Sequence, residues 1–174
     1  MNGTLFLIGI SIGNAKDITL RVKAILEEVS VLACEDTREI GRLLKELGIT
    51  PHKEFISIFE HSEQMKVPKL IQRLKSGEDI GCVVSRGMPV ISDPGYLLLR
   101  EAIREEIAVK VIPGVSAVTT ALVASGLPPD KFLFLGFPPR KDQKQRNFFE
   151  KYKDLDVTLI FFESPRRIFK TLKN

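Results

Sequence analysis

Five short apolar runs alternate with five amphipathic helical segments up to residue 125, and this alternation constrains the fold more than any other feature. The helical segments carry apolar residues three and four positions apart, as expected for helices that bury one face. Five strand–helix units in succession predict a parallel sheet covered on both faces, and so an α/β fold. The predicted strands are Leu5–Ile10, Val31–Cys34, Phe55–Phe59, Ile80–Val84 and Val109–Ile112. The predicted helices are Ile18–Val29, Thr37–Leu47, Val67–Leu74, Gly95–Glu105 and Gly114–Ser125.

A proline-containing segment, Gly126–Lys131, is the best candidate for a linker because its two prolines end the preceding helix and stiffen the connection. We therefore predict an N-terminal α/β domain over residues 1–126 and the beginning of a second α/β domain over 127–174. The second part contains two further strand-like runs and two helical segments. A segment of this size rarely builds a core of its own. It is expected to pack on the first domain or a second subunit, or to be a piece of a larger domain.

The positive charge is concentrated near the end of the sequence. The chain carries a net charge of +4, but residues 138–174 hold ten Lys/Arg against five Asp/Glu, and the remainder holds sixteen against seventeen. This asymmetry favours contact with a polyanion such as RNA. The alternative is a solvated, lysine-rich helical face.

Two cysteines and two histidines show neither a metal-binding nor a redox spacing. Cys34 and Cys82 lie in separate apolar runs without a CxxC partner, and His52 and His61 do not pair as metal ligands. The first residues lack the basic segment of a signal peptide, and no apolar run is long enough to span a bilayer. We therefore expect buried, reduced thiols in a cytoplasmic protein that has no membrane contact and no metal.

Four polar loops follow predicted strands. In an open α/β sheet, ligands bind at the carboxyl ends of the strands, so these loops are candidates for a common site. None has a dinucleotide fingerprint, a phosphate-binding P-loop or a hydrolase nucleophile elbow. An uncharged or zwitterionic ligand held by backbone groups fits them best, and the alternative is a set of ordinary polar connections. The loops are Ile10–Asn14, Cys34–Arg38, Ser85–Gly95 and Pro113–Ala117.

A series of short motifs in these loops and beyond resembles the tetrapyrrole-methylase superfamily, whose members use S-adenosylmethionine (SAM). Within this superfamily, the chain is similar to the branch of 16S ribosomal RNA cytidine 2′-O-methyltransferases. The motifs run in order from end to end of the chain, although each is weak alone. They are Ile12–Asn14, Asp17–Arg21, Cys34–Arg38, Glu60–His61, Ile91–Tyr96, Pro113–Gly114, Ser116–Ala117, Ala124–Pro128, Gly136–Phe137, Pro139–Lys141, Glu163–Pro165 and Arg167.

The resemblance implies two α/β domains with SAM in the cleft between them, a homodimer, and methylation of a cytidine ribose in the 16S rRNA of the small ribosomal subunit. The local alternatives are turn residues for Gly13 and Asp93 and a helix N-cap for Ser116. The positions that match SAM contacts of the family are Gly13, Ser85, Gly87, Pro89, Ile91, Ser92, Asp93, Ser116 and Ala117.

Methyl transfer to a ribose hydroxyl also needs a proton acceptor and contacts to RNA phosphates. Glu35 and Asp36 have an alternative role as helix caps, Glu60 and His61 as a solvated pair, and Arg38 as the ion-pair partner of Asp36. The candidates for the catalytic base are Glu35, Asp36, Glu60 and Glu163, with His61 beside them. The candidates for RNA contact are Arg38, Arg140, Lys141, Lys144, Arg146, Arg166 and Arg167.

The loop Ser85–Gly95 departs from the pattern that this branch usually has. It is one residue shorter, Arg86 stands where an acidic residue is usual, and Val90 replaces a glycine. Val90 is expected to resist a positive φ, and a lost hydrogen bond to the cofactor lowers affinity roughly ten- to a hundredfold. Family members also continue beyond the segment that follows Pro165. Three functions stay open: an rRNA 2′-O-methyltransferase, a tetrapyrrole-precursor methyltransferase, and a non-catalytic remnant that binds RNA or a partner.

Overall fold

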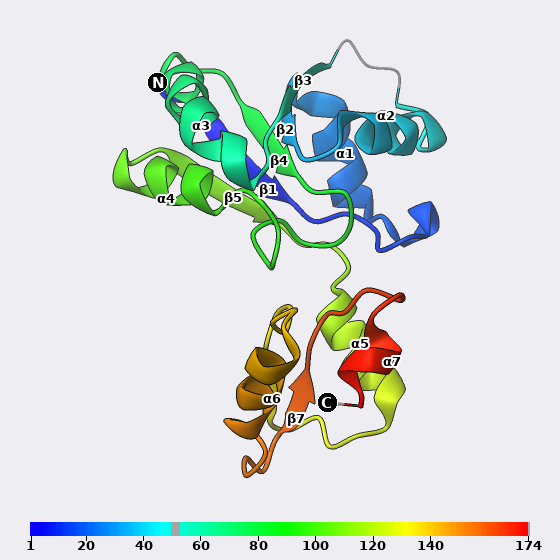
Figure 1. Ribbon diagram of the computed structural model, residues 1–174. Helices are drawn as coiled ribbons and strands as arrows, with labels where there is room; N and C mark the ends of the chain where they lie inside the picture. Colours follow the sequence, from blue (N-terminus) through cyan, green and yellow to red (C-terminus); the bar gives the residue numbers. More distant parts are fainter. Residues whose placement is uncertain (50–52, 174) are drawn as a thin grey trace. The chain divides into compact units, whose positions relative to one another are not determined.

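A computed structural model describes residues 1–49 and 53–173, without the side chains of residues 60 and 61. The chain forms two compact units, Met1–Ser116 and Ala117–Asn174, each of which is described here by itself (Figure 1). The predicted domain limits, 1–126 and 127–174, place the helix that precedes Gly126 in the first domain. In the structure this helix packs with the second unit, so the compact units divide ten residues earlier. The predicted domain limits of this chain remain a proposal.

The first unit is built on a five-stranded sheet in which every strand pair is parallel, as the alternation of strands and helices predicted. The strand order is β3-β2-β4-β1-β5. All residues of β2 and β4 are buried, and so are four of the five in β1, which explains why these strands read as continuous apolar runs. The strands are β1 (Thr4–Ile8), β2 (Val31–Cys34), β3 (Glu54–Ser57), β4 (Ile80–Val83) and β5 (Ala108–Ile112).

Helices cover both faces of this sheet (Figure 1). Alternate residues of β1 enter two separate cores, because successive side chains of a strand point to opposite faces. The helices are α1 (Leu20–Glu28), α2 (Thr37–Glu46), α3 (Glu60–Lys75) and α4 (Tyr96–Arg104), and a 3-10 turn (Ala15–Asp17) precedes α1. One core joins the sheet to α1 and α2 and includes Phe6, Ile8, Val22, Leu26, Ile40 and Leu44. The other joins it to α3 and α4 and includes Leu5, Leu7, Leu70, Leu74, Leu98 and Ala102.

This arrangement positions a site at the carboxyl ends of the central strands. The chain leaves β1 and β2 toward helices on one face, and it leaves β3 and β4 toward helices on the other. Strand β4 lies between β1 and β2, so the loop after β4 diverges from both of its neighbours. Such a divergence opens a crevice outside the strand ends, which is where open α/β sheets bind ligands.

Helix α3 is longer than its sequence pattern indicated. The predicted helix was Val67–Leu74, whereas α3 begins at Glu60 and contains Pro68. A proline inside a helix removes one backbone hydrogen bond and is usually confined to the first turn. Here the first two turns are held because Ser62, Glu63 and Val67 are buried against the rest of the first unit, while Pro68 is exposed to solvent. Tertiary packing therefore overrides the local signal.

The second unit is a small parallel α/β element. Strands β6 and β7 pair in parallel, and Val118 and Leu122 of α5 form an apolar cluster with Ile160. Two aromatic side chains, Phe134 and Phe162, complete this cluster with ring centroids 4.8 Å apart. The elements are α5 (Ala117–Ser125), β6 (Phe132–Phe134), α6 (Asp142–Glu150), β7 (Thr158–Ile160) and α7 (Ile168–Thr171). In the described parts of both units, every helix is too short or too polar to cross a membrane.

Candidate functional site

The loop between β4 and α4 is hydrogen-bonded to the chain that leaves β1. The Ile10 N–H donates to the Gly87 carbonyl at 2.8 Å, and the Gly87 N–H donates to the Ser11 carbonyl at 3.2 Å. Gly87 has a φ of 73°, a conformation that glycine adopts without strain. Two predicted ligand loops are therefore held side by side, at the crevice that the topology defines.

A cavity of about 690 Å³ lies beside this loop, at the carboxyl ends of β2 and β4. It brings together three predicted site residues, Glu35, Ser92 and Asp93, and a fourth is close by, since the Ser85 hydroxyl donates to Glu35 Oε2 at 3.3 Å. The described residues that line it include three carboxylates and no lysine or arginine. The lining residues are Glu35, Phe59, Glu63, Gln64, Val90, Ser92, Asp93, Pro94, Tyr96 and Leu97.

Asp93 is a carboxyl group of this cavity whose pKa is altered by its surroundings. Desolvation raises its pKa to about 6, and the negative charge of Glu35 adds to this rise. A group of this kind takes up and releases a proton near neutral pH. Perturbed acids in a cleft are typical of functional sites, although ion-pair networks produce them too.

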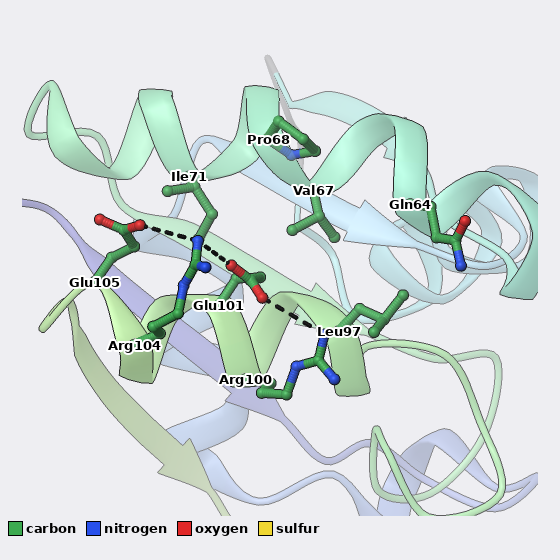
Figure 2. A pocket seen from close by; sticks show the side chains of 9 residues that line it. All are labelled: Gln64, Val67, Pro68, Ile71, Leu97, Arg100, Glu101, Arg104 and Glu105. Carbon is green, nitrogen blue, oxygen red and sulfur yellow. Dashed lines mark hydrogen bonds and ion pairs between the residues drawn. The ribbon is translucent and has the colours of Figure 1, made fainter.

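Two further hollows lie on the first unit. One of about 200 Å³ includes Gly13, Ser85 and Arg86 in its lining, so it continues the predicted site toward the loop after β1. The other, about 440 Å³, lies between α3 and α4 (Figure 2). The charged side chains at its rim pair with one another, and Arg104 Nη2 lies 2.6 Å from Glu101 Oε2. This hollow lies in the outer layer of helices. The crevice at the strand ends is therefore the stronger candidate.

One of the candidate bases, Asp36, already has structural partners. Asp36 caps α2 by accepting hydrogen bonds from the backbone N–H groups of Arg38, at 2.8 Å, and Glu39, at 3.3 Å. These bonds, and the nearby Arg38 charge, lower the pKa of Asp36. Arg38 is 83% exposed and lies 3.5 Å from Asp36, which is the ion pair that the sequence left open. Asp36 and Arg38 therefore make the contacts that the local alternatives describe.

Glu163 belongs to the second unit and anchors α7. Its side chain is only 2% exposed and accepts hydrogen bonds from the Thr171 hydroxyl and the Ser164 N–H, both at 2.7 Å, while Arg167 lies 3.2 Å away. Desolvation raises the pKa of Glu163, but these hydrogen bonds and the charges of Arg167 and Arg140 outweigh it and leave the pKa lowered. These contacts favour a structural role. The side chains of the fourth candidate, Glu60, and of His61 lie outside the described residues.

The remaining predicted residues fall into three groups. Pro89 is buried, while Ile91 is 48% exposed. Ser116 ends the first unit and Ala117 begins the second. Apart from Arg38, the candidates for RNA contact belong to the second unit, and all of these are exposed except Arg167, which pairs with Glu163: Arg140, Lys141, Lys144, Arg146, Arg166 and Arg167.

Seven cavity residues were not among the predicted site residues: Phe59, Glu63, Gln64, Val90, Pro94, Tyr96 and Leu97. Phe59 and Glu63 lie at the start of α3, where the sequence pattern placed no helix. The only available signal was Ser62, whose hydroxyl accepts from the Phe59 N–H as in a capping box. The predicted burial of both cysteines is confirmed, and burial raises the pKa of Cys34 to about 11 and that of Cys82 to about 12.

Val90 was expected to resist a positive φ, and the structure corrects this: its φ is 76°. Ser92 follows with 63°. A β-branched residue in this region is strained by about 1–3 kcal/mol and stays there only where its surroundings impose the conformation. The bond from the Val90 N–H to the Pro94 carbonyl, at 3.3 Å, closes this part of the loop.

We expect the Val90→Gly protein to be more stable than the Val90→Ala protein by about 1 kcal/mol, because only glycine adopts this φ freely. Both variants remove the valine methyl groups, so their difference isolates the backbone. Urea denaturation of the two variants measures it. In ordinary helices and strands alanine is the more stable of the two, and that order here would contradict strain at residue 90.

These features define an α/β protein with a ligand-sized cavity at the carboxyl ends of parallel strands. The chain matches the family described as Tetrapyrrole (Corrin/Porphyrin) Methylases over residues 4–174. It belongs to this family, as its motifs predicted.

Individual relatives carry a ribosomal name. The chain is 47% identical over 173 residues to "Ribosomal RNA small subunit methyltransferase I" of Streptococcus pyogenes serotype M1, covering 99% of this chain and 60% of the relative. It is 45% identical over 170 residues to the protein of the same name from Halalkalibacterium halodurans, covering 98% and 58%. The chain thus spans about 60% of the length of these relatives.

Solved structures share the fold. Diphthine synthase has a TM-score of 0.73 at 20% identity, covering 94% of this chain and 66% of the other. Uroporphyrin-III-C-methyltransferase from Thermus thermophilus has a TM-score of 0.59 at 24% identity, covering 82% and 66%. At these identities the likeness establishes the fold and no more.

Proposed function

We propose that the protein is a SAM-dependent methyltransferase that modifies the 2′-hydroxyl of a cytidine in the 16S RNA of the small ribosomal subunit. The observation that carries this proposal is the 47% identity, over 99% of the chain, to a relative named as a small-subunit rRNA methyltransferase. An RNA substrate of this kind places the activity in the cytoplasm. The family resemblance favours a homodimer.

The cavity at the ends of β2 and β4 suits SAM in size and charge. Its volume of about 690 Å³ lies within the range of small-molecule sites. When bound, SAM supplies a methyl group on a positively charged sulfur, and it also carries an ammonium group. The carboxylates of Glu35 and Asp93 complement these charges, and Ser85 and Ser92 add hydroxyl groups at the same edge. We propose that Asp93, Ser85 and Ser92, with Gly13 and Gly87, hold the cofactor.

The chain's contribution to the reaction is to align the ribose hydroxyl with the methyl group and to receive its proton. Alignment supplies roughly 7–11 kcal/mol in favourable reactions, and a general base about 10²–10⁴-fold in rate. Asp36 and Glu163 are held by structural contacts. Glu35 is exposed at the end of β2 beside Ser85. We therefore propose Glu35 as the proton acceptor among the described candidates.

The basic side chains of the second unit are proposed to contact RNA phosphates. Five of them project into solvent: Arg140, Lys141, Lys144, Arg146 and Arg166. Phosphate contacts of this kind position an RNA and supply affinity that does not depend on sequence. A tetrapyrrole precursor has no phosphate groups for such contacts.

Calorimetric titration with SAM, followed by methyl transfer to small ribosomal subunits from cells that lack this modification, tests the proposal. We expect single-site binding and incorporation of one methyl group per subunit at a ribose 2′-oxygen. Uroporphyrinogen serves as the comparison substrate, and its methylation instead of RNA would indicate a tetrapyrrole enzyme. Absence of both heat and a thermal shift at millimolar SAM would leave only a non-catalytic role.

A further inference from the structure

Glu63 connects α3 to the end of the loop that carries Ser92 and Asp93. Glu63 is buried, with 5% of the residue exposed, and its Oε1 atom accepts hydrogen bonds from three backbone N–H groups across 32 to 35 residues of sequence. The donors and their distances are Gly95 at 3.1 Å, Leu97 at 3.0 Å and Leu98 at 3.2 Å.

These donors belong to the N-cap and first turn of α4. The first N–H groups of a helix have no partner within the helix, and the N-cap side chain usually accepts from one of them. The N-cap of α4 is Gly95, which has no side chain to do so. A carboxylate from another helix therefore takes this role. Its negative charge is favourable there because the helix dipole is positive at its N-terminus.

The loop that Glu63 anchors has an unfavourable backbone. Val90, Ser92 and Gly95 have φ angles of 76°, 63° and 113°, and two of these three residues are not glycine. Such conformations persist only where surrounding contacts over-determine them. The loop is fixed at one end by the bonds between Gly87 and the chain leaving β1, and at the other by Glu63.

We propose that Glu63 is a positioning residue for the cofactor: it fixes the start of α4 and thereby holds Ser92 and Asp93 in the conformation that binds SAM. This inference rests on the proposed function for the identity of the ligand. The anchoring of the loop by Glu63 stands on the hydrogen bonds alone. Glu63 lines the same cavity as Ser92 and Asp93, which places the anchor directly beside the ligand site.

Amide hydrogen exchange and SAM titration on Glu63→Ala and Glu63→Gln proteins test the inference. In Glu63→Ala we expect exchange at the amides of Gly95, Leu97 and Leu98 to rise about tenfold or more, and the Kd for SAM to rise about tenfold. The Gln variant keeps an oxygen acceptor without the charge, and charge-assisted bonds are about twice as strong as neutral ones. It should give intermediate values, roughly threefold, in both measurements, and so partly rescue the loss.

Glu78→Ala is the matched control. Glu78 pairs with Arg73, with Oε2 2.5 Å from Nε, beside the amino end of β4 and thus at the opposite edge of the sheet. Its loss should lower the melting temperature while leaving both the affinity for SAM and the exchange of the three amides unchanged. A Glu63→Ala protein that matches this control in both measurements overturns the inference.

The two proposals fail in different measurements. Absence of SAM binding by the wild-type protein overturns the proposed function and the ligand that the inference names. Unchanged exchange at the three amides in Glu63→Ala overturns the anchoring itself. If the Ala variant does not fold, the Gln variant decides, because unchanged exchange in that folded protein also overturns the anchoring.

Discussion

Replacing Gly114 by alanine is expected to destabilise the protein by about 3 kcal/mol. A Cβ at this position would lie 2.3 Å from both the carbonyl carbon and the oxygen of Gly9, which are backbone atoms that cannot move aside. Gly9 is itself fixed, because its N–H donates to the Ile112 carbonyl at 2.9 Å. The added methyl group must therefore separate the ends of β1 and β5, from which two of the site loops begin.

Gly41→Ala is the matched control for this substitution. Gly41 lies inside α2, and apart from its chain neighbours and the backbone of its own helix no atom lies within 4 Å of the position that its Cβ would take. Alanine is the better helix former, so this variant should gain about 0.5–1 kcal/mol. Chemical denaturation of both variants gives the two free energies of unfolding. Equal changes in the two proteins would show that the close approach of Gly9 and Gly114 does not constrain the strand ends.

The sheet was predictable because its central strands are buried on both faces. Strand β2 was predicted with its observed bounds, Val31–Cys34, and β4 differs by one residue. Strands that are buried on both faces are recognised in the sequence as continuous runs of apolar residues. Helix α3 was not predicted in full, because Pro68 resembles a helix start when it is read locally. What holds the preceding turns is the burial of Ser62 and Glu63, which depends on the assembled sheet.

The location of the candidate site could be predicted from the sequence, but the contacts that hold its loops in place could not. Topology predicts that the loops after the strands lie together, and the cavity does bring the loops of Glu35, Ser85 and Asp93 side by side. The individual residues were singled out by the resemblance to the family, and their roles stay a proposal. Val90 was predicted to resist a positive φ and adopts one nevertheless, because the contacts that hold the whole loop outweigh the preference of a single residue. Glu63 was missed because its three partners lie more than thirty residues away.

Asp93→Asn is expected to stabilise the protein and weaken SAM binding at the same time. The pKa of Asp93 is raised to about 6, above the ordinary value near 3.9, so folding disfavours its ionised form. This penalty is absent below about pH 4, grows as the pH rises to about 6, and stays constant above. Asparagine removes it. The gain above pH 6 should be about 1 kcal/mol, since partial solvent exposure screens the carboxyl group, and should vanish at about pH 4.

The affinity should move in the opposite direction. Loss of a charged partner for a cationic ligand lowers affinity roughly ten- to a hundredfold. Glu35→Gln tests the stability effect: it removes the charge that helps to raise the pKa of Asp93, so stability should level off at a lower pH in this variant than in the wild-type protein. Thermal melts from pH 4 to 8 and SAM titrations at about pH 7.5 measure both quantities. A less stable Asp93→Asn protein would contradict the desolvated carboxyl, and an unchanged Kd would remove Asp93 from the proposed cofactor contacts. A gain in stability together with a loss of SAM affinity in one variant indicates a residue whose charge is unfavourable for folding and is needed by the ligand.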